Sequence, residues 1–396
     1  MSVPILIHVL SLDTVGGVEA LYVHYLKEAL SHGTALHYTC VSGKRPHPKF
    51  TEALSQYKHT PFLEQYAFGL RLPRFLRSIV NIRRGMVEGI VTPTAWVFWN
   101  RIEEKIPPGR SIYYEHGASW TLSPTKRRKQ FLNHASSLIA VSEAARIMLQ
   151  KRWDVSSPIT VIPNPLRPDI RLVANPRTYA PTQHLRLGFA GRLVPIKGPL
   201  VPLHVLKQLH DEKIPSTLFI AGQGAEEHTM RSTAKHLGIS SSVYFSGCVG
   251  NMQSWFDSID ILLVPSIREP LGLVALEAAA RGVPVIAANV DGLAEVGSNI
   301  LIDPTIPLNK ADSLLADKEG LPELVVDPAK KDLVEPKILD PKTCASTILR
   351  LMNDSRLYET CSLEGLQKAQ ERSCFTTYYE SLKSILENNP EVDSSV

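Results

Sequence analysis

The chain has 396 residues, 44% of them hydrophobic and 21% charged, and a formal net charge of +4. This length suits two or three domains, and the composition is that of a globular protein. No apolar run approaches the roughly 18 residues that cross a bilayer, so the sequence predicts no membrane-spanning helix. Residues 1–178 hold 23 Lys+Arg and 12 Asp+Glu, a charge of +11, whereas residues 179–396 hold 20 and 27, a charge of −7.

Five cysteines are scattered without the spacing of metal ligands, which indicates a reduced compartment and neither a disulfide framework nor a structural zinc. They are Cys40, Cys248, Cys344, Cys361 and Cys374. The opening apolar stretch, residues 3–10, is short and lacks a basic flank, so it predicts a buried strand rather than a signal peptide. We therefore expect a cytoplasmic protein, either free or at the inner face of the cytoplasmic membrane.

Short apolar segments rich in Val and Ile alternate with helical patterns, which is typical of parallel sheets built from strand–helix–strand units. The predicted strands are 5–10, 36–41, 88–92, 111–115, 137–141 and 159–162 in the front half, and 185–190, 217–221, 243–246, 261–265 and 283–287 in the back half. Predicted helices include 200–210, 226–237 and 273–281. The fold class is therefore α/β, with two doubly wound domains.

Two glycines, Gly16 and Gly17, follow the first predicted strand and open the first helix. Glycine there lets backbone N–H groups approach a phosphate or an acceptor closely. A strand-to-helix turn also uses glycine for its geometry alone, so this feature is weak by itself.

Residues 71–84 place apolar side chains at helical spacing, with Pro73 near the start, and predict an amphipathic helix with a cationic polar face. Such a helix can lie on an anionic membrane surface, but an ordinary surface helix explains the pattern at least as well. The candidates for membrane contact are Arg71, Arg74, Arg77, Arg83 and Arg84. Nucleic-acid binding is not predicted, because these residues belong to no recognisable binding motif.

His116 ends the strand predicted at 111–115, where an imidazole could bind a sugar hydroxyl, although a lone histidine is more often structural. Four prolines then interrupt residues 164–183, so we expect one domain over 1–178 and a second from 179. Two sheets joined there would enclose a cleft lined by the loops that follow the strands.

Arg192 and Lys197 share the loop that follows the first back-half strand, between Gly191 and Gly198. Two cations on one ordered loop suit the neutralisation of a diphosphate leaving group, and the alternative is a solvated pair.

Glu269 and Glu277 stand eight residues apart around a predicted helix start at Gly272 and Leu273. A glycine at this start lets an anion reach the free N–H groups of the helix. Glu277 can accept hydrogen bonds from the vicinal hydroxyls of a ribose, while Glu269 can face a sugar ring. The alternative is that Glu277 is a solvated helix residue and Glu269 a first-turn charge that the helix dipole favours.

Taken together, these motifs resemble those of the retaining, nucleotide-sugar-dependent glycosyltransferases of the GT-B type, the large family 4 group, over about residues 4–300. The resemblance implies two Rossmann-like domains facing each other across a cleft, with a last helix at 376–386 that returns to the front domain, so that the second domain covers 179–375. It also implies that Arg192 and Lys197 hold the donor diphosphate, Glu277 the ribose and Glu269 the donor sugar. His116 would lie near the transferred sugar, and the turn at Gly222 beside the base.

Two departures from the family pattern stand out. Pro270 and Leu271 replace the Gly and Phe that the family often has, and an extended stretch at 301–341 replaces its compact loop. We expect the stretch to be either an insertion at the cleft edge that affects substrate choice or a plain surface loop.

The expected reaction moves a sugar, with retained configuration, from a UDP- or GDP-linked donor to a hydroxyl of a glycan or lipid-linked acceptor. The expected setting is the synthesis of cell-surface polysaccharide, lipopolysaccharide or glycolipid. No cofactor or metal is expected, because two cations and a helix start can stabilise the leaving diphosphate. A nucleotide-sugar epimerase on the same fold and a nucleotide-sugar-binding pseudoenzyme stay open as alternatives. A dinucleotide oxidoreductase is disfavoured, because no Gly-x-Gly-x-x-Gly turn follows the first strand of either half.

Overall fold

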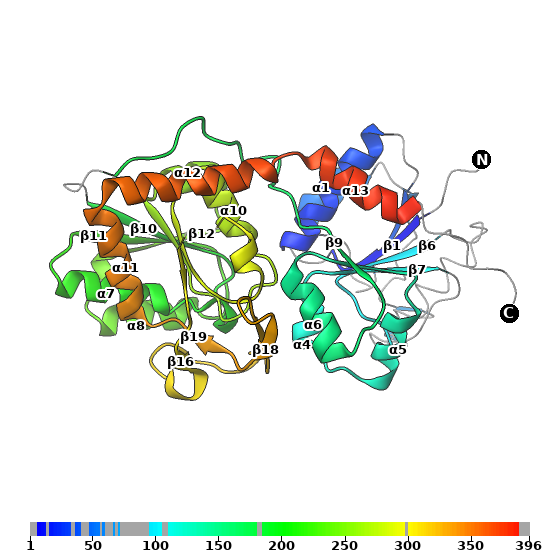
Figure 1. Cartoon of the computed structure of the whole chain (residues 1–396), viewed down its shortest axis with the longest axis horizontal. Helices are drawn as coiled ribbons and strands as arrows, with labels where there is room; N and C mark the ends of the chain where they lie inside the picture. The colour runs from blue at the N-terminus through cyan, green and yellow to red at the C-terminus, as the bar shows by residue number, and fades with distance from the viewer. Residues whose placement is uncertain are drawn as a thin grey trace, which may run out of the picture. The chain divides into compact units, whose positions relative to one another are not determined.

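The computed structural model shows the chain as two compact units (Figure 1). Unit 1 contains residues 1–141, 149–164 and 376–396, and unit 2 contains residues 142–148 and 165–375. Residues 165–178, which the sequence prediction gave to the front domain, are grouped with unit 2. The structure describes residues 6–12, 16–32, 36–40, 47–55, 58–59, 66–67, 70–71, 95–104, 110–179, 184–297 and 300–387.

Unit 1 is built on a seven-stranded parallel sheet of order β3-β2-β1-β6-β7-β8-β9. Its strands are β1 (Leu6–Leu10), β2 (Leu36–Cys40), β3 (Lys58–His59), β6 (Ala95–Trp99), β7 (Ser111–Glu115), β8 (Ser137–Ala140) and β9 (Ile159–Val161). Its helices are α1 (Gly17–Ser31), α2 (Thr51–Leu54), α4 (Ala118–Thr121), α5 (Lys126–His134), the C-terminal part of α6 (Glu143–Trp153) and most of α13 (Phe375–Glu387). The strand order reverses between β1 and β6, which makes the sheet doubly wound.

Strand β6 is absent from the sequence prediction, which instead placed a strand at 88–92, outside the described residues. All five residues of β6 are buried, and Trp96 and Phe98 pack in a core with Tyr113 of β7. A strand buried on both faces has no polar alternation, so the periodicity that reveals half-buried strands does not mark it.

Unit 2 is built on a six-stranded parallel sheet of order β12-β11-β10-β13-β14-β15. Its strands are β10 (Leu185–Ala190), β11 (Ser216–Ala221), β12 (Val243–Gly247), β13 (Ile261–Val264), β14 (Val285–Ala288) and β15 (Ile300–Ile302). This is the order of a dinucleotide-binding Rossmann sheet, with its reversal between β10 and β13. The five back-half strands that the sequence predicted are confirmed to within a few residues at their ends.

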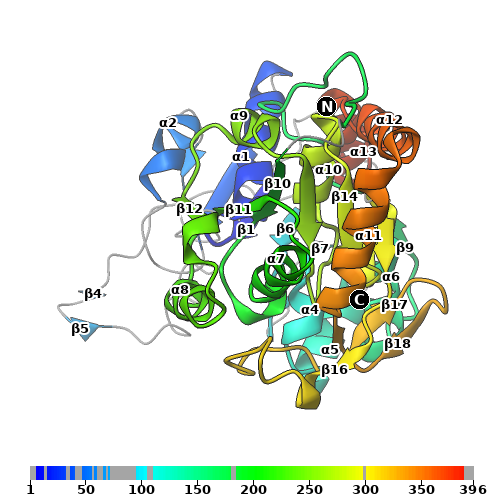
Figure 2. The same ribbon diagram turned by 90° about the vertical axis from the view of Figure 1, so that its left-hand side faces the viewer.

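Helices cover both faces of the unit 2 sheet (Figures 1 and 2). They are α7 (Val201–Asp211), α8 (Glu227–His236), α9 (Met252–Asp257), α10 (Leu273–Ala280), α11 (Pro341–Asn353) and α12 (Ser355–Glu371). Helix α7 packs with α11 on one face, and α10 packs with α12 on the other.

The stretch at 301–341 is more than a plain surface loop. It contains two small antiparallel pairs, β16 (Ile306–Pro307) with β19 (Lys337–Ile338) and β17 (Val325–Asp327) with β18 (Asp332–Val334). Val325, Val326 and Ile338 are almost fully buried. The stretch therefore contributes buried apolar side chains to the structure.

The basic segment at 71–84 lies almost wholly outside the described residues, as do Arg74, Arg77, Arg83 and Arg84. Arg71 closes a two-residue strand, β5 (Leu70–Arg71), which pairs with β4 (Tyr66–Ala67). Within the described ranges, no helix is both long enough and apolar enough to cross a membrane.

Candidate functional site

The predicted donor-binding residues of unit 2 follow strands β10, β11 and β13, at the carboxyl edge of its sheet. Strands β10 and β13 pair directly, with Leu187 opposite Ile261. The chain leaves these two strands in opposite directions, and the crevice at such a reversal is where open α/β sheets bind ligands.

The loops after β10 and β13 are joined along their backbones. The Ile267 N–H donates to the Ile196 carbonyl at 2.9 Å. Gly198 has a φ of +61°, and a Cβ there would stand 2.4 Å from the Pro265 carbonyl oxygen. Only glycine suits this close approach, so Gly198 fixes the loop that carries Lys197 against the loop that carries Glu269.

Lys197 and Glu269 form a partly buried ion pair, with side chains 20% and 11% exposed. The Lys197 ammonium donates to Glu269 Oε2, and the Ser266 hydroxyl donates to the same oxygen at 3.2 Å. The structure thus brings together the two residues that the sequence assigned to the diphosphate and to the sugar. Arg192, on the same loop as Lys197, is exposed.

Helix α10 begins after Gly272, which has a φ of +94°. A Cβ on Gly272 would stand 2.5 Å from Leu293 Cδ2 and 3.3 Å from Glu269 Cγ. A side chain at this position would therefore both strain the backbone and displace Glu269. The glycine leaves the first N–H groups of α10, from Leu273 onward, beside the Lys197–Glu269 pair, where they suit an anion.

Glu277 lies on α10 and is only 7% exposed, so it is not the solvated residue of the alternative interpretation. Arg167 approaches it, with Nε 3.1 Å from Glu277 Oε1, and also pairs with Asp169 at 3.3 Å. Burial raises the pKa of Glu277 to about 7; Arg167 opposes the rise and Asp169 adds to it. A carboxyl group with a pKa near 7 is ionised above neutral pH. The ionised form can accept hydrogen bonds from vicinal hydroxyls.

The turn at Gly222 rests directly on the loop that carries Arg192. Leu193 N–H donates to the Gln223 carbonyl at 2.9 Å, and Gly222 N–H donates to the Gly247 carbonyl at 2.8 Å. Gly222 has a φ of +140°, and a Cβ there would stand 1.8 Å from the Gly191 carbonyl oxygen. The backbone segments at the carboxyl ends of β10, β11 and β12 are therefore in direct contact with one another.

We expect Gly222→Ala to lower the free energy of unfolding by roughly 3 kcal/mol, because it adds a backbone clash to an unfavourable φ. Gly238→Ala is the matched control, since Gly238 has a φ of +70° but nothing within 4 Å of a Cβ. That control should cost only about 1–2 kcal/mol. Chemical denaturation of both variants measures the difference, and equal losses would contradict the steric argument.

In unit 1, His116 follows β7 and is 8% exposed. Its ring stacks on Trp99 with centroids 5.7 Å apart and packs on Tyr114 at 4.1 Å. Neither ring nitrogen has a hydrogen-bond partner among the described residues, and burial lowers the pKa of His116 to about 3. The imidazole is therefore neutral, and both of its nitrogens are buried with their hydrogen-bonding capacity unused within the described part of the chain.

Two side chains fix the backbone on either side of this imidazole. Asn100 Oδ1 accepts from the His116 N–H at 3.1 Å and from the Ala118 N–H at 2.8 Å. The fully buried Glu115 carboxylate accepts from the Tyr113 hydroxyl and from the N–H groups of Gly117 and Ser119. Neither Asn100 nor Glu115 was predicted as a functional residue from the sequence. The available signal was a glutamate adjacent to a candidate histidine in Tyr113-Tyr-Glu-His116.

Gly16 and Gly17 open helix α1, as expected, but their conformation is ordinary. Gly16 has a φ of −127°, which any residue adopts, and a Cβ there would meet only the flexible carboxyl end of Glu19, at 2.5 Å. The structure therefore gives no backbone reason for glycine at position 16.

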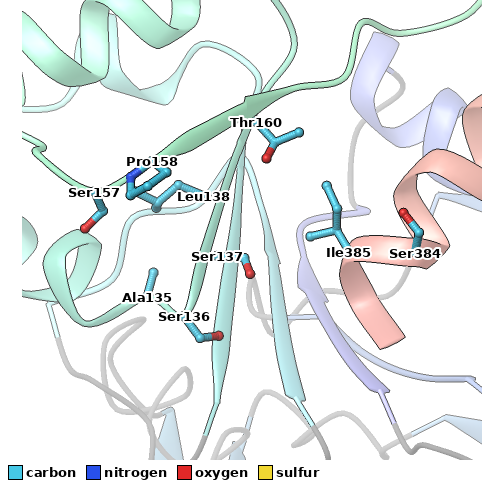
Figure 3. Close-up of a pocket in the computed structure, with 9 residues that line it drawn as sticks. All are labelled: Ala135, Ser136, Ser137, Leu138, Ser157, Pro158, Thr160, Ser384 and Ile385. Atoms are coloured by element: carbon cyan, nitrogen blue, oxygen red, sulfur yellow. The ribbon is translucent and has the colours of Figure 1, made fainter. Parts of the chain in front are cut away.

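A pocket of about 520 Å³ also lies in unit 1, apart from these residues (Figure 3). It is formed where β8 and β9 begin and where α13 ends, and it is lined by Ala135, Ser136, Ser137, Leu138, Ser157, Pro158, Thr160, Ser384 and Ile385. It contains no charged side chain and stands at the amino edge of the sheet. Among the described residues, no group of three or more His, Cys, Asp or Glu could hold a metal ion.

Two protein families match the chain. Residues 15–170 match the family described as Glycosyltransferase Family 4, and residues 176–300 match the family described as Glycosyl transferases group 1.

Curated relatives align with part of the chain. A D-inositol 3-phosphate glycosyltransferase of Streptomyces avermitilis is 39% identical over 136 residues, which cover 32% of this chain and 29% of the relative. The protein of the same name from Streptomyces scabiei is 35% identical over 182 residues, 41% of each chain. The chain thus spans less than half the length of the curated relatives it matches.

Solved structures match almost the whole chain. A crystal structure of Anabaena HepE in complex with UDP-glucose superposes with a TM-score of 0.70 at 16% identity, over 96% of this chain and 99% of the other. The structure of WaaG, a glycosyltransferase involved in lipopolysaccharide biosynthesis, superposes with a TM-score of 0.67 at 15% identity. The superposition covers 97% of this chain and 100% of the WaaG chain. At these identities the likeness shows the fold.

Proposed function

We propose that the chain transfers a sugar from a nucleoside diphosphate to a hydroxyl. It matches two glycosyltransferase families, over residues 15–170 and 176–300, and has the GT-B fold of two Rossmann-like units. The single observation that carries the proposal is the meeting of Lys197, Glu269 and the Gly272 helix start at one sheet edge, with Glu277 buried on the same helix. Each is a partner for one part of a nucleotide sugar.

In the proposed reaction, the bond between the sugar C1 and the diphosphate oxygen breaks, and a bond from C1 to the acceptor oxygen forms on the same face. The acceptor proton passes to the departing phosphate oxygen, so no side chain needs to act as a covalent nucleophile. Negative charge grows on the diphosphate as the bond breaks. Lys197, Arg192 and the first N–H groups of α10 would stabilise that charge more in the transition state than in the bound donor.

We propose a UDP- or GDP-linked donor and a glycan or lipid-linked acceptor in cell-surface glycan synthesis. Two observations on similar proteins support this choice: the HepE structures hold UDP-glucose or UDP, and WaaG is involved in lipopolysaccharide biosynthesis.

The test is saturation-transfer NMR of the protein against UDP-, GDP-, ADP- and TDP-sugars. Binding of one donor that is lost in both Glu277→Ala and Arg192→Ala would support the donor site and identify the substrate for an acceptor screen. Binding of no donor would overturn the proposed function. Interconversion of the bound nucleotide sugar without an acceptor would instead indicate an epimerase.

We expect the affinity for that donor to fall as the pH is lowered through about 7. The affinity changes in this direction because the pKa of Glu277 is raised to about 7. Above this pH Glu277 is an ionised carboxylate that can accept hydrogen bonds from the two ribose hydroxyls, and below it the group is protonated. Arg167→Gln removes the charge that opposes the rise and should move the midpoint to higher pH, whereas Glu277→Gln should abolish the dependence. Calorimetric titration of the sugar donor between about pH 5.5 and 8.5 measures it, because a diphosphate diester does not titrate there.

A further inference from the structure

The loop that carries Glu269 is held by a short turn from a different part of unit 2, the 3₁₀ helix η4 (Asp291–Glu295). The Glu269 N–H donates to Asp291 Oδ2 at 2.9 Å, and the Gly292 N–H donates to the Glu269 carbonyl at 3.0 Å. The backbone N–H and the backbone carbonyl of Glu269 therefore both form hydrogen bonds with this turn. The turn thus fixes the Cα of Glu269, while Lys197 and Ser266 hold the carboxylate at the other end of the side chain.

The same turn packs against the residues that follow Glu269. A Cβ on Gly292 would stand 2.2 Å from the Pro270 carbonyl oxygen, so the two backbones are in close contact. Leu293 is fully buried and covers Gly272. The loop from Glu269 to Gly272 therefore rests on the turn along its whole length.

The other carboxylate oxygen of Asp291 accepts a hydrogen bond from the stretch at 301–341. Asp291 Oδ1 accepts from the Val326 N–H of strand β17 at 2.7 Å. Val326 is 1% exposed and is held in register by the β17–β18 pair. One carboxylate thus ties the loop of Glu269 to a strand that the usual compact loop of this fold would not supply.

Asp291 occupies this place at an energetic cost. It is 1% exposed, and it has a φ of +47°, a backbone conformation that residues other than Gly, Asn and Asp rarely adopt. A buried carboxylate is retained where hydrogen bonds compensate its desolvation, and here two N–H groups from separate segments do so. An asparagine in this place would turn its NH₂ group toward one of the two N–H groups, because their bonds end on different oxygens of the carboxylate.

We propose that Asp291 is a positioning residue through which strand β17 sets the place of the Glu269 carboxylate, and with it the preference of the donor site for its sugar. This inference rests on the proposed function, because Glu269 is the residue assigned there to the donor sugar. It gives the 301–341 stretch a role in substrate choice rather than in folding alone.

The test compares nucleoside diphosphate with its sugar conjugate. Calorimetry gives the dissociation constants of UDP and UDP-glucose, GDP and GDP-mannose, ADP and ADP-glucose, and TDP and TDP-glucose, and the pair that the unaltered protein binds is used. In Asp291→Asn, which tolerates the φ, we expect the sugar conjugate to bind about tenfold more weakly and the bare diphosphate to bind unchanged within about twofold. Val326→Pro removes the N–H at the other end of the bridge and should give the same selective loss.

The control is Asp312→Asn, which removes a carboxylate from an exposed pair with Lys318 in the same stretch and should change neither constant. Thermal unfolding shows whether each variant is folded. Equal weakening of both ligands in a folded Asp291→Asn protein would mean a purely structural role, and no change in either would mean no role; both results would overturn the proposal. Failure of the unaltered protein to bind any of the eight ligands would instead overturn the proposed function itself.

Discussion

The Lys197→Ala protein is expected to lose a factor of about a hundred to a thousand in kcat/KM for the sugar donor, the usual effect of removing one group that stabilises charge in a transition state. Lys197 is fixed by Gly198 on one side and by Glu269 on the other, so its ammonium is already in place before the diphosphate begins to depart. No other lysine lies on this loop to replace it. The measurement is the rate of nucleotide release from the donor identified by NMR.

The matched control for this change is Lys207→Ala, on helix α7 of the same unit, where the lysine pairs with Asp211 one helical turn away. Its loss should leave kcat/KM unchanged and cost at most about 0.5 kcal/mol of stability. Because Lys197→Ala also leaves Glu269 without its cation, Glu269→Gln alone and the double variant Lys197→Ala, Glu269→Gln complete a cycle that separates the two causes. A Lys197→Ala enzyme within threefold of the unaltered one would exclude the assigned role.

The second large effect is expected on stability. We expect Glu115→Ala to lower the free energy of unfolding by roughly 3–5 kcal/mol, because three buried donors lose their acceptor at once. These donors are the Tyr113 hydroxyl and the N–H groups of Gly117 and Ser119. For a unit of this size the midpoint of thermal unfolding should fall by about 10 °C. Catalysis should fall too, because the backbone that orients His116 is released.

Two further variants make the Glu115 experiment decisive. Glu115→Gln keeps the shape and one acceptor oxygen, so it should cost only about 1–2 kcal/mol. Glu103→Ala removes another carboxylate of unit 1, one that pairs with Arg101 and is partly exposed, and should cost less than about 1 kcal/mol. Calorimetric unfolding of the three proteins ranks them, and a Glu115→Ala protein as stable as Glu103→Ala would refute the argument.

The sequence was sufficient for the elements whose signal is local. The strand at Leu185–Ala190 and the helix from Leu273 were predictable because their apolar runs are bounded by glycine, proline or charge. The candidate pair Lys197 and Glu269 was also predictable, since residues that follow neighbouring parallel strands meet at one edge.

The sequence was insufficient to predict contacts between residues that lie far apart in the chain. Arg167 lies in a proline-rich segment with no helical or strand pattern, and only the fold brings it to Glu277. Asp291 was visible in the sequence, but its two hydrogen-bond partners are 22 and 35 residues away in the chain. The burial of Glu277, which raises its pKa, likewise cannot be predicted from the neighbouring residues in the sequence.

The ion pair between Lys197 and Glu269 also bears on how an occupied site would empty. Lys197 and Glu269 pair with each other, so under the proposed assignment a nucleotide sugar would replace both partners, with hydroxyls for Glu269 and phosphate for Lys197. A nucleotide sugar brings both, whereas the nucleoside diphosphate left after transfer brings only the phosphate. Re-formation of the pair then competes with the spent nucleotide for Lys197, so loss of the sugar would itself promote release and prepare the site for the next turnover.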